Sequence, residues 1–178
     1  DWHQPFDRVC NFDNPPFVKW FEGGQTNLCH NAVDRHLADR AGQAALIAIS
    51  SETGTEITHT FQDLHDEVQR MAASLKALGV AKGDRVLIYM PMIAEAAFAM
   101  LACARIGAVH CVVFGGFASG SLASRIEDAA PKVIVSADAG SRGGKALPYK
   151  PLLDEAIRLS SHKPGAMLLA DRGLASME

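Results

Sequence analysis

Residues 86–136 read VLIYMPMIAEAAFAMLACARIGAVHCVVFGGFASGSLASRIEDAAPKVIVS, and this stretch decides the fold. Short apolar runs alternate along it with longer segments of helical length. In chain order these are 86–90, 93–106, 109–114, 121–129 and 133–136. The short runs are typical of strands that are buried on both faces. Gly107 and Pro131 end the longer segments, as they commonly end helices. The alternation predicts a parallel sheet with right-handed helical crossovers.

The segment before this stretch has a strongly amphipathic pattern. Thr60 and Asp63 have the spacing of a capping box, and Gly79 is a typical helix terminator. Apolar residues recur at helical period between them: Phe61, Leu64, Val68, Met71, Ala72, Leu75 and Leu78. The pattern predicts an amphipathic helix over 61–78.

Shorter elements are predicted on both sides of these. Residues 44–50 and 57–60 flank a glycine-containing turn at 51–55 and predict a β-hairpin. A helix around 152–160 and a strand at 167–170 continue the alternation downstream. The fold class predicted is therefore α/β, with a partial parallel sheet flanked by helices and preceded by a β-hairpin.

Residues 1–30 are rich in aromatic side chains and in Pro and Gly. So many breakers predict an arm without a long helix or strand, and we expect its aromatic residues to pack onto the domain behind it. Asn31 occupies the position of an N-cap, with Asp34 at the third helical position. This predicts a short helix that ends near Asp39.

The composition excludes several classes of protein. The chain has 178 residues, of which 48% are hydrophobic and 21% charged, as in a globular domain rather than a disordered or collagen-like chain. A net charge of −3 gives no general attraction to nucleic acid or to an anionic membrane. The longest apolar stretch, 86–114, contains Glu95 and Arg105 and is not a membrane span. Without a C-x-x-C pair or an N-glycosylation sequence, we expect a cytoplasmic location and neither a nucleic-acid nor a membrane partner.

Two glycine-rich segments follow predicted strands. Gly115, Gly116 and Gly120 follow the strand at 109–114, and residues 137–145 follow the strand at 133–136. Ligands of open parallel sheets bind at the carboxyl ends of the strands, so both segments should lie at one ligand-binding edge. Arg142 and Lys145 could contact a phosphate there, while the glycines would let the backbone approach it. The alternative is a flexible, solvated surface loop with ordinary cations.

Several familiar site motifs are absent from the sequence. It contains neither a P-loop, nor G-x-G-x-x-G after a strand, nor a G-x-S-x-G elbow. No two of its seven histidines are four residues apart, so we expect no helical metal site. Asp34, Glu67, Glu95 and Asp128 lie on predicted helices and are expected to be solvated or to cap them. None of these residues forms a self-sufficient active site.

Longer motifs are more specific than these single residues. They are WFEGGQTN at 20–27, NAVDRH at 31–36, PMIAE at 91–95, MLACARIGA at 100–108 and VVFGGF at 112–117. The chain resembles, nearly from end to end, the short-chain acyl-CoA synthetases of the adenylate-forming enzymes. Three further stretches favour the branch that acts on propionate, with the acetate branch as the alternative. They are residues 26–31, 136–145 and 147–154.

The resemblance implies a reaction and a set of site residues. Members of the family condense a carboxylate with Mg-ATP to an acyl-adenylate, and the CoA thiol then displaces AMP. The CoA-binding residues implied are Arg142, Gly143, Gly144 and Lys145, and those implied for the wall of the pantetheine channel are Phe114, Gly115 and Gly116. The family more often has Arg where this chain has Lys145, although a lysine still supplies a point charge.

The family's phosphate loop, its aromatic-x-x-Glu motif, its ribose-binding Asp and its catalytic Lys are missing from the sequence. We therefore expect the N-terminal portion of a longer ligase, with no catalytic or metal-binding residue and inactive alone. It would comprise an arm and short helix over 1–40 and the first part of the AMP-binding domain over 41–178, with the remainder of the parent chain as partner. Two other hypotheses are a stand-alone module that binds CoA or a similar phosphorylated ligand, and an assembly segment that packs through its apolar helix and aromatic arm.

Overall fold

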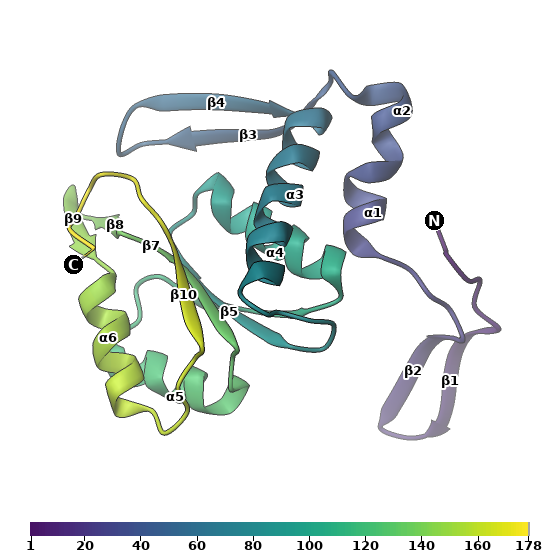
Figure 1. Ribbon diagram of the computed structural model, residues 1–178. Helices are drawn as coiled ribbons and strands as arrows, with labels where there is room; N and C mark the ends of the chain where they lie inside the picture. Colours follow the sequence, from purple (N-terminus) through teal and green to yellow (C-terminus); the bar gives the residue numbers. More distant parts are fainter. Residues whose placement is uncertain (178) are drawn as a thin grey trace.

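The computed structural model describes residues 1–177, except for the side chain of Arg142. A parallel sheet lies at its centre (Figure 1). Its strands, in spatial order, are β10 (Ala166–Ala170), β7 (Val133–Ala137), β5 (Arg85–Met90) and β6 (Val109–Phe114). All neighbouring strands in this sheet run parallel. The predicted α/β fold with a partial parallel sheet is confirmed.

Helices cover both faces of the sheet. α3 (Phe61–Ala77) and α4 (Ala94–Ile106) pack on one face, and α5 (Ser119–Ala129) and α6 (Lys150–Leu159) pack on the other. No helix within residues 1–177 is long and apolar enough to cross a membrane.

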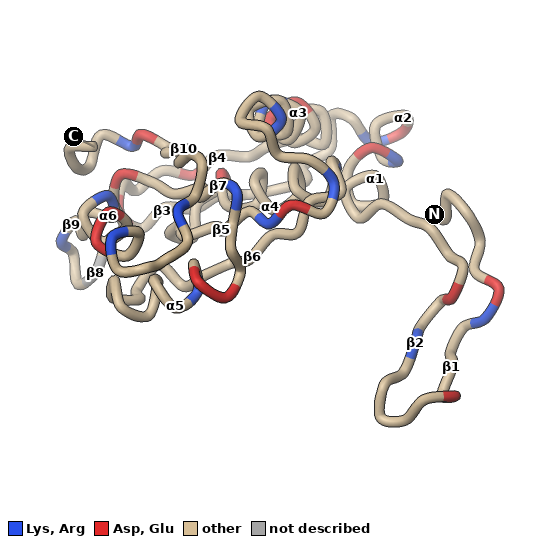
Figure 2. Tube along the Cα trace, turned by 60° about the horizontal axis from the view of Figure 1, so that its bottom comes forward, with Lys and Arg blue, Asp and Glu red and all other residues tan. Residues whose placement is uncertain are grey.

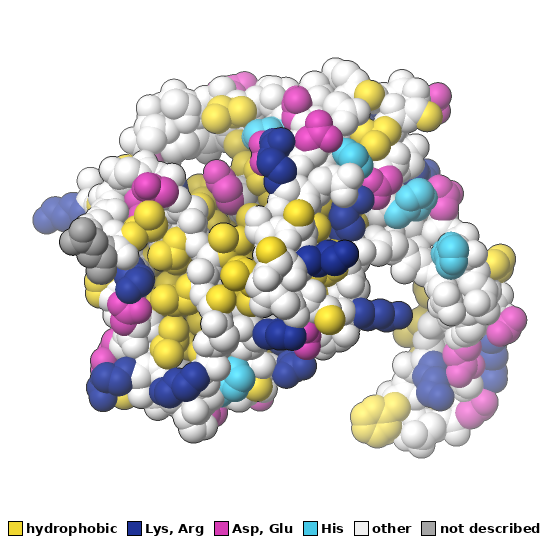
Figure 3. Space-filling view, in the orientation of Figure 1, with side chains coloured by type: hydrophobic (Ala, Val, Ile, Leu, Met, Phe, Trp, Pro, Cys, Tyr) yellow, Lys and Arg dark blue, Asp and Glu magenta, His cyan; other side chains and the backbone are white. Residues whose placement is uncertain are grey.

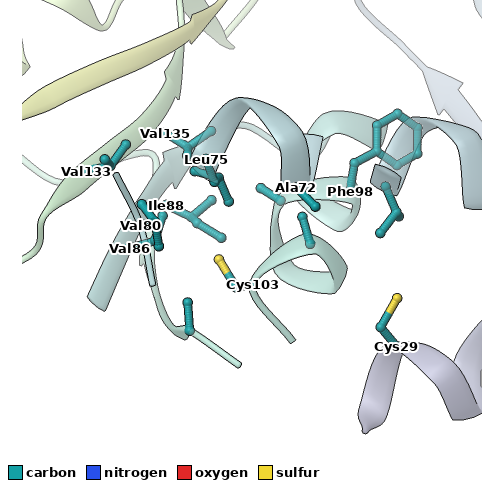
Figure 4. Close-up of a cluster of buried hydrophobic side chains, with 14 of the residues drawn as sticks. Cys29, Ala72, Leu75, Val80, Val86, Ile88, Phe98, Cys103, Val133 and Val135 are labelled. Atoms are coloured by element: carbon teal, nitrogen blue, oxygen red, sulfur yellow. The ribbon is translucent and has the colours of Figure 1, made fainter. Parts of the chain in front are cut away.

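Strand β5 is buried on both faces. Because side chains alternate across a strand, Val86 and Ile88 enter the core beneath α3 and α4, whereas Leu87 and Tyr89 enter the core beneath α5 and α6. Figure 4 shows the first core, where Leu75 lies near Val86 and Ile88. A strand covered on both sides needs apolar residues at every position, and this explains the continuous apolar run in the sequence.

Local signals determine the ends of α3 and α4. In the predicted capping box, Thr60 Oγ1 accepts a hydrogen bond from the Asp63 backbone N–H at 3.1 Å, and Asp63 Oδ2 accepts one from the Thr60 N–H at 2.9 Å. α4 ends at Gly107, whose φ of +73° lies in the left-handed region that glycine adopts without steric cost.

Two hairpins flank the sheet. β3 (Ala44–Ser50) and β4 (Thr55–Thr60) pair antiparallel, as predicted. β8 (Ala139–Arg142) and β9 (Lys145–Pro148) form a second hairpin. The prediction of a loop over 137–145 was therefore wrong. Most of this segment is antiparallel strand, because the backbone before the turn pairs with the backbone after it.

The N-terminal segment also contains a hairpin. β1 (Arg8–Asn14) pairs antiparallel with β2 (Phe17–Glu22). The prediction of an arm without a long strand was wrong here. Pro15 and Pro16 occupy the turn, where the missing backbone N–H of proline interrupts no ladder.

The aromatic residues of this segment pack on one another. The ring centroids of Trp2, Phe6 and Phe21 are 5.2–5.4 Å apart. Phe17 and Trp20 are 73% and 61% exposed. Figures 1 and 2 show the β1–β2 hairpin projecting away from the sheet and its helices. The prediction that these aromatic residues pack onto the domain was therefore wrong.

Short helical elements connect the arm to the domain: α1 (Leu28–Ala32), the 3-10 helix η1 (Asp34–His36) and α2 (Leu37–Arg40). Asn27, and not Asn31 as predicted, is the N-cap, because its side chain accepts a hydrogen bond from the backbone N–H three residues on at 3.1 Å. The backbone of Val33 leaves the helical region, with φ −127° and ψ −67°, and divides the predicted single helix.

Candidate functional site

The carboxyl ends of the central strands meet at one edge of the sheet. β5 and β6 end in register, with Met90 opposite Phe114, and Tyr89 of β5 lies opposite Ser136 of β7. The two glycine-rich segments follow β6 and β7 directly, so they leave the sheet on the same side. The predicted common edge is confirmed.

A cavity of about 1030 Å³ opens at this edge. Its lining comes from the β3–β4 hairpin, the start of α4, the end of β6 and the β8–β9 hairpin. Figure 3 shows hydrophobic side chains gathered in the hollowed face beneath the β3–β4 hairpin. The predicted site residues Phe114, Gly115 and Gly116 all lie in the cavity wall.

Tyr149 connects the two glycine segments. Its side chain is buried, and its ring packs on that of Tyr89 with centroids 4.7 Å apart. A Cβ atom at Gly115 would lie 2.3 Å from the Tyr149 hydroxyl oxygen, and a Cβ at Gly140 would lie equally close. Both positions therefore require glycine so that the tyrosine can fit. Sequence reasoning gave Gly115 a role toward a ligand and did not identify Tyr149.

Gly143 and Gly144 form the turn of the β8–β9 hairpin. Their φ angles are +59° and +76°, as a two-residue hairpin turn with both central residues in the left-handed region requires. Arg142 pairs with Lys145 across this turn, and the Lys145 side chain is exposed. Figure 2 shows the basic positions at this hairpin. The side chain of Arg142 lies outside the described part of the chain.

Asp138 carries a carboxylate that the sequence pattern did not single out. It follows β7, is fully buried, and accepts hydrogen bonds from the backbone N–H groups of Ala139 at 2.7 Å, Leu174 at 2.6 Å and Ala175 at 3.2 Å. Burial raises the pKa of this carboxyl. The backbone hydrogen bonds together lower the pKa by more than burial raises it, so the pKa of Asp138 lies below its usual value. Asp138 therefore anchors the segment after β10 at the carboxyl edge.

An ion pair joins that segment to the β3–β4 hairpin. Arg172 binds Glu52 at the tip of the hairpin and also donates to the Ala139 carbonyl oxygen at 3.0 Å. Glu52 and Arg172 both line the cavity. The contact holds the hairpin over the carboxyl edge and closes one side of the cavity.

The carboxylates predicted to be solvated differ in their surroundings. Asp34 is corrected: it is partly buried and binds Arg105 at 2.6 Å, with His65 at 3.5 Å. Glu67 and Glu95 line the cavity, and Asp128 is exposed. Asp34 thereby ties the segment after α1 to α3 and α4. Within residues 1–177, no group of three or more His, Cys, Asp or Glu side chains could hold a metal ion.

Two family models match the sequence. The one described as AMP-binding enzyme matches residues 33–172, and the one described as acetyl-coenzyme A synthetase N-terminus matches residues 1–32. Together they divide the chain between the arm with α1 and the α/β domain.

Individual relatives agree with these matches. The chain is 63% identical over 177 residues to a propionate–CoA ligase of Salmonella typhimurium and 62% identical to one of Escherichia coli, covering 99% of this chain and 28% of each relative. It is 52% identical over 159 residues to an acetyl-coenzyme A synthetase of Thiobacillus denitrificans, covering 89% of this chain and 24% of the relative. The chain thus spans 28% or less of the length of these curated relatives.

Proposed function

This chain belongs to the AMP-binding enzymes, and we propose that it forms the N-terminal part of a ligase that joins propionate to CoA. Propionate and ATP would give propionyl-adenylate and pyrophosphate, and CoA would then displace AMP to give propionyl-CoA. The observation that carries the proposal is the 63% identity to a propionate–CoA ligase along 99% of the chain, against 52% along 89% for an acetyl-coenzyme A synthetase. The family expected from the sequence motifs is confirmed.

The CoA site of this proposal lies at the carboxyl edge of the sheet. The uncharged pantetheine arm runs along Phe114, Gly115 and Gly116, which line the cavity. Arg142 and Lys145, with the Gly143–Gly144 turn between them, take the phosphates. The position of this turn beside the cavity supports the assignment, because one extended ligand can then reach both.

The rest of the parent chain completes the enzyme. The chain spans 28% of the propionate–CoA ligases it matches, so the groups that bind Mg-ATP and catalyse adenylation are placed in the remaining sequence, and residues 1–178 are inactive alone. Val112 and Phe114 of the edge strand β6 are 58% and 72% exposed, which supports a role for this edge in binding that remainder. Residues 1–40 form the arm and 41–178 the first part of the large domain, in a cytoplasmic enzyme.

The test is an assay of the full-length protein for AMP formation that depends on both a carboxylate and CoA. We expect a higher kcat/KM with propionate than with acetate, whereas a preference for acetate would replace the proposed substrate. Absence of turnover with any short carboxylate would overturn the proposed function. Turnover by residues 1–178 alone would show that the catalytic groups were placed wrongly.

Variants test the phosphate contacts separately. Loss of a hydrogen bond to a charged group costs about 1.5–3 kcal/mol, so Arg142→Ala or Lys145→Ala should raise the KM for CoA about tenfold to hundredfold. Lys19→Ala on the distant β1–β2 hairpin, where Lys19 is 74% exposed, is the matched control and should leave this KM unchanged. Equal KM values for CoA in all three variants would contradict the assignment of the turn.

A further inference from the structure

Tyr149 is a buried residue whose hydroxyl group forms no hydrogen bond with the described residues, yet its oxygen is not sealed from the cavity in the way that the unpaired Arg105 Nε is sealed in the protein. The Tyr149 side chain is 4% exposed and lines the cavity. Buried tyrosine hydroxyls usually find a partner. The other tyrosine of the chain, Tyr89, does so, because it donates to the Phe117 carbonyl oxygen at 2.9 Å. The Tyr149 hydroxyl is thus available to donate a hydrogen bond to a group bound in the cavity.

The position of this donor is held by the fold. The ring of Tyr149 packs against Tyr89 at an interplanar angle of 38°. Its oxygen occupies a notch that exists only because Gly115 and Gly140 lack a Cβ. Burial is the main cause that raises the pKa of the phenol, so the hydroxyl keeps its proton at neutral pH. A donor held in place in this way loses little conformational entropy when a ligand binds.

The charges around the cavity select an uncharged ligand group. Glu52 is neutralised by Arg172, and Glu67 by Arg70 at 2.5 Å. Glu95 also lines the cavity and forms no ion pair with the side chains that the structure describes, which exclude that of Arg142. The remaining negative charge repels phosphate and carboxylate groups. A neutral acceptor such as an amide carbonyl oxygen avoids this repulsion.

We propose that the Tyr149 hydroxyl donates a hydrogen bond to an amide carbonyl of the pantetheine arm and so sets the position of that arm in the cavity. The inference rests on the proposed function and adds a binding residue to it. CoA carries its phosphates at one end and two amides in its uncharged arm. The phosphate end of CoA matches the exposed Lys145 at the hairpin tip. The uncharged arm matches the cavity beside it, whose lining is mainly apolar with a few glutamates.

The test compares two thiol substrates in the full-length ligase: CoA, and pantetheine, which has the amides but no phosphate. Tyr149→Phe removes the hydroxyl with little change in shape and should lower kcat/KM about fivefold for both thiols, the effect of one neutral hydrogen bond. Lys145→Ala should lower it for CoA alone. The KM values for ATP and propionate should not change in Tyr149→Phe.

Two further variants separate binding from packing. Tyr89→Phe is the matched control, because it removes a hydroxyl that is already satisfied within the protein; it should lower Tm but leave the thiol kinetics within twofold of wild type. Gly140→Ala displaces the Tyr149 hydroxyl and should reproduce the loss seen in Tyr149→Phe. The double variant should lose no more than either single variant, because both remove the same contact.

The outcomes distinguish the inference from the proposed function. A wild-type enzyme that forms no acyl-CoA overturns both. An active wild type whose Tyr149→Phe variant changes kcat/KM by less than twofold for both thiols overturns the inference alone. So does a loss confined to CoA, which would assign the hydroxyl to the nucleotide end, or an equal loss in Tyr89→Phe, which would assign the effect to packing of the tyrosine pair.

Discussion

Replacing Asp138 by Asn should destabilise the chain strongly. The carboxylate is fully buried; one oxygen accepts the Ala139 N–H and the other accepts the N–H groups of Leu174 and Ala175. An amide has nearly the same shape but only one oxygen. In either orientation, its NH₂ group therefore faces a backbone N–H, and at least one buried donor is left without an acceptor.

The size of the loss follows from these contacts. With the amide oxygen toward Leu174 and Ala175, the unpaired Ala139 N–H costs about 1–3 kcal/mol. The other two hydrogen bonds change from charged to neutral, at about 1 kcal/mol each. The free energy of unfolding should thus fall by about 3–5 kcal/mol, a large part of the about 5–15 kcal/mol of a typical domain.

Urea unfolding followed by circular dichroism measures this loss. With a slope of about 2 kcal/mol per molar urea, the midpoint should fall by about 1.5–2.5 M. Asp154→Asn is the matched control: Asp154 is exposed, binds Lys150 at 2.8 Å, and should contribute about 0.5 kcal/mol or less. A loss in Asp138→Asn no larger than in this control would refute the reasoning.

The same carboxylate makes stability depend on pH. Because the pKa of Asp138 is lowered in the folded state, its contribution is complete above the unfolded-state pKa of about 3.9 and is lost as the pH falls through the lower folded value. The difference in unfolding free energy between wild type and Asp138→Asn should therefore narrow below about pH 4. A difference that stays constant down to about pH 2 would contradict this.

Three other perturbations test the fold. Leu75→Ala, in the core beneath α3, should reduce the free energy of urea unfolding by about 2–5 kcal/mol, and a loss below about 1 kcal/mol would show that the site is not close-packed. Thr60→Ala removes the capping box of α3 and should cost about 1 kcal/mol, with faster amide exchange confined to the first turn of that helix. Hydrogen bonds from the side chains of Ser160 and Ser161 lower the pKa of Glu127 to about 2, which a carboxyl NMR titration can measure. The stability that Glu127 contributes should be present above its usual pKa of about 4.3 and be lost toward pH 2, and Glu127→Gln should lack this dependence.

Much of the candidate site was visible in the sequence. Strand direction follows from the alternation of short apolar runs with helices, so the meeting of the segments after β6 and β7 at one edge could be predicted. Phe114, Gly115 and Gly116 accordingly line the cavity. The roles of Asp138 and Tyr149 could not be predicted, because each depends on atoms brought from elsewhere in the chain. Asp138 binds residues 36 and 37 positions away, and Tyr149 fills a notch between glycines of two different segments.

The sequence by itself determined the elements whose signals act within one or two turns of chain. The apolar run at 86–90, the Thr60–Asp63 capping box and the stop at Gly107 all have the predicted structure. Only the tertiary structure decided the β1–β2 hairpin, the contacts of the buried Asp138 carboxylate and the notch that holds the Tyr149 hydroxyl. The physical reason is the distance along the chain between the groups that interact. A helix cap or a glycine terminator forms its hydrogen bonds with residues a few positions away. Strand pairing, a buried carboxylate and the tyrosine notch require backbone groups that only the folded chain brings together.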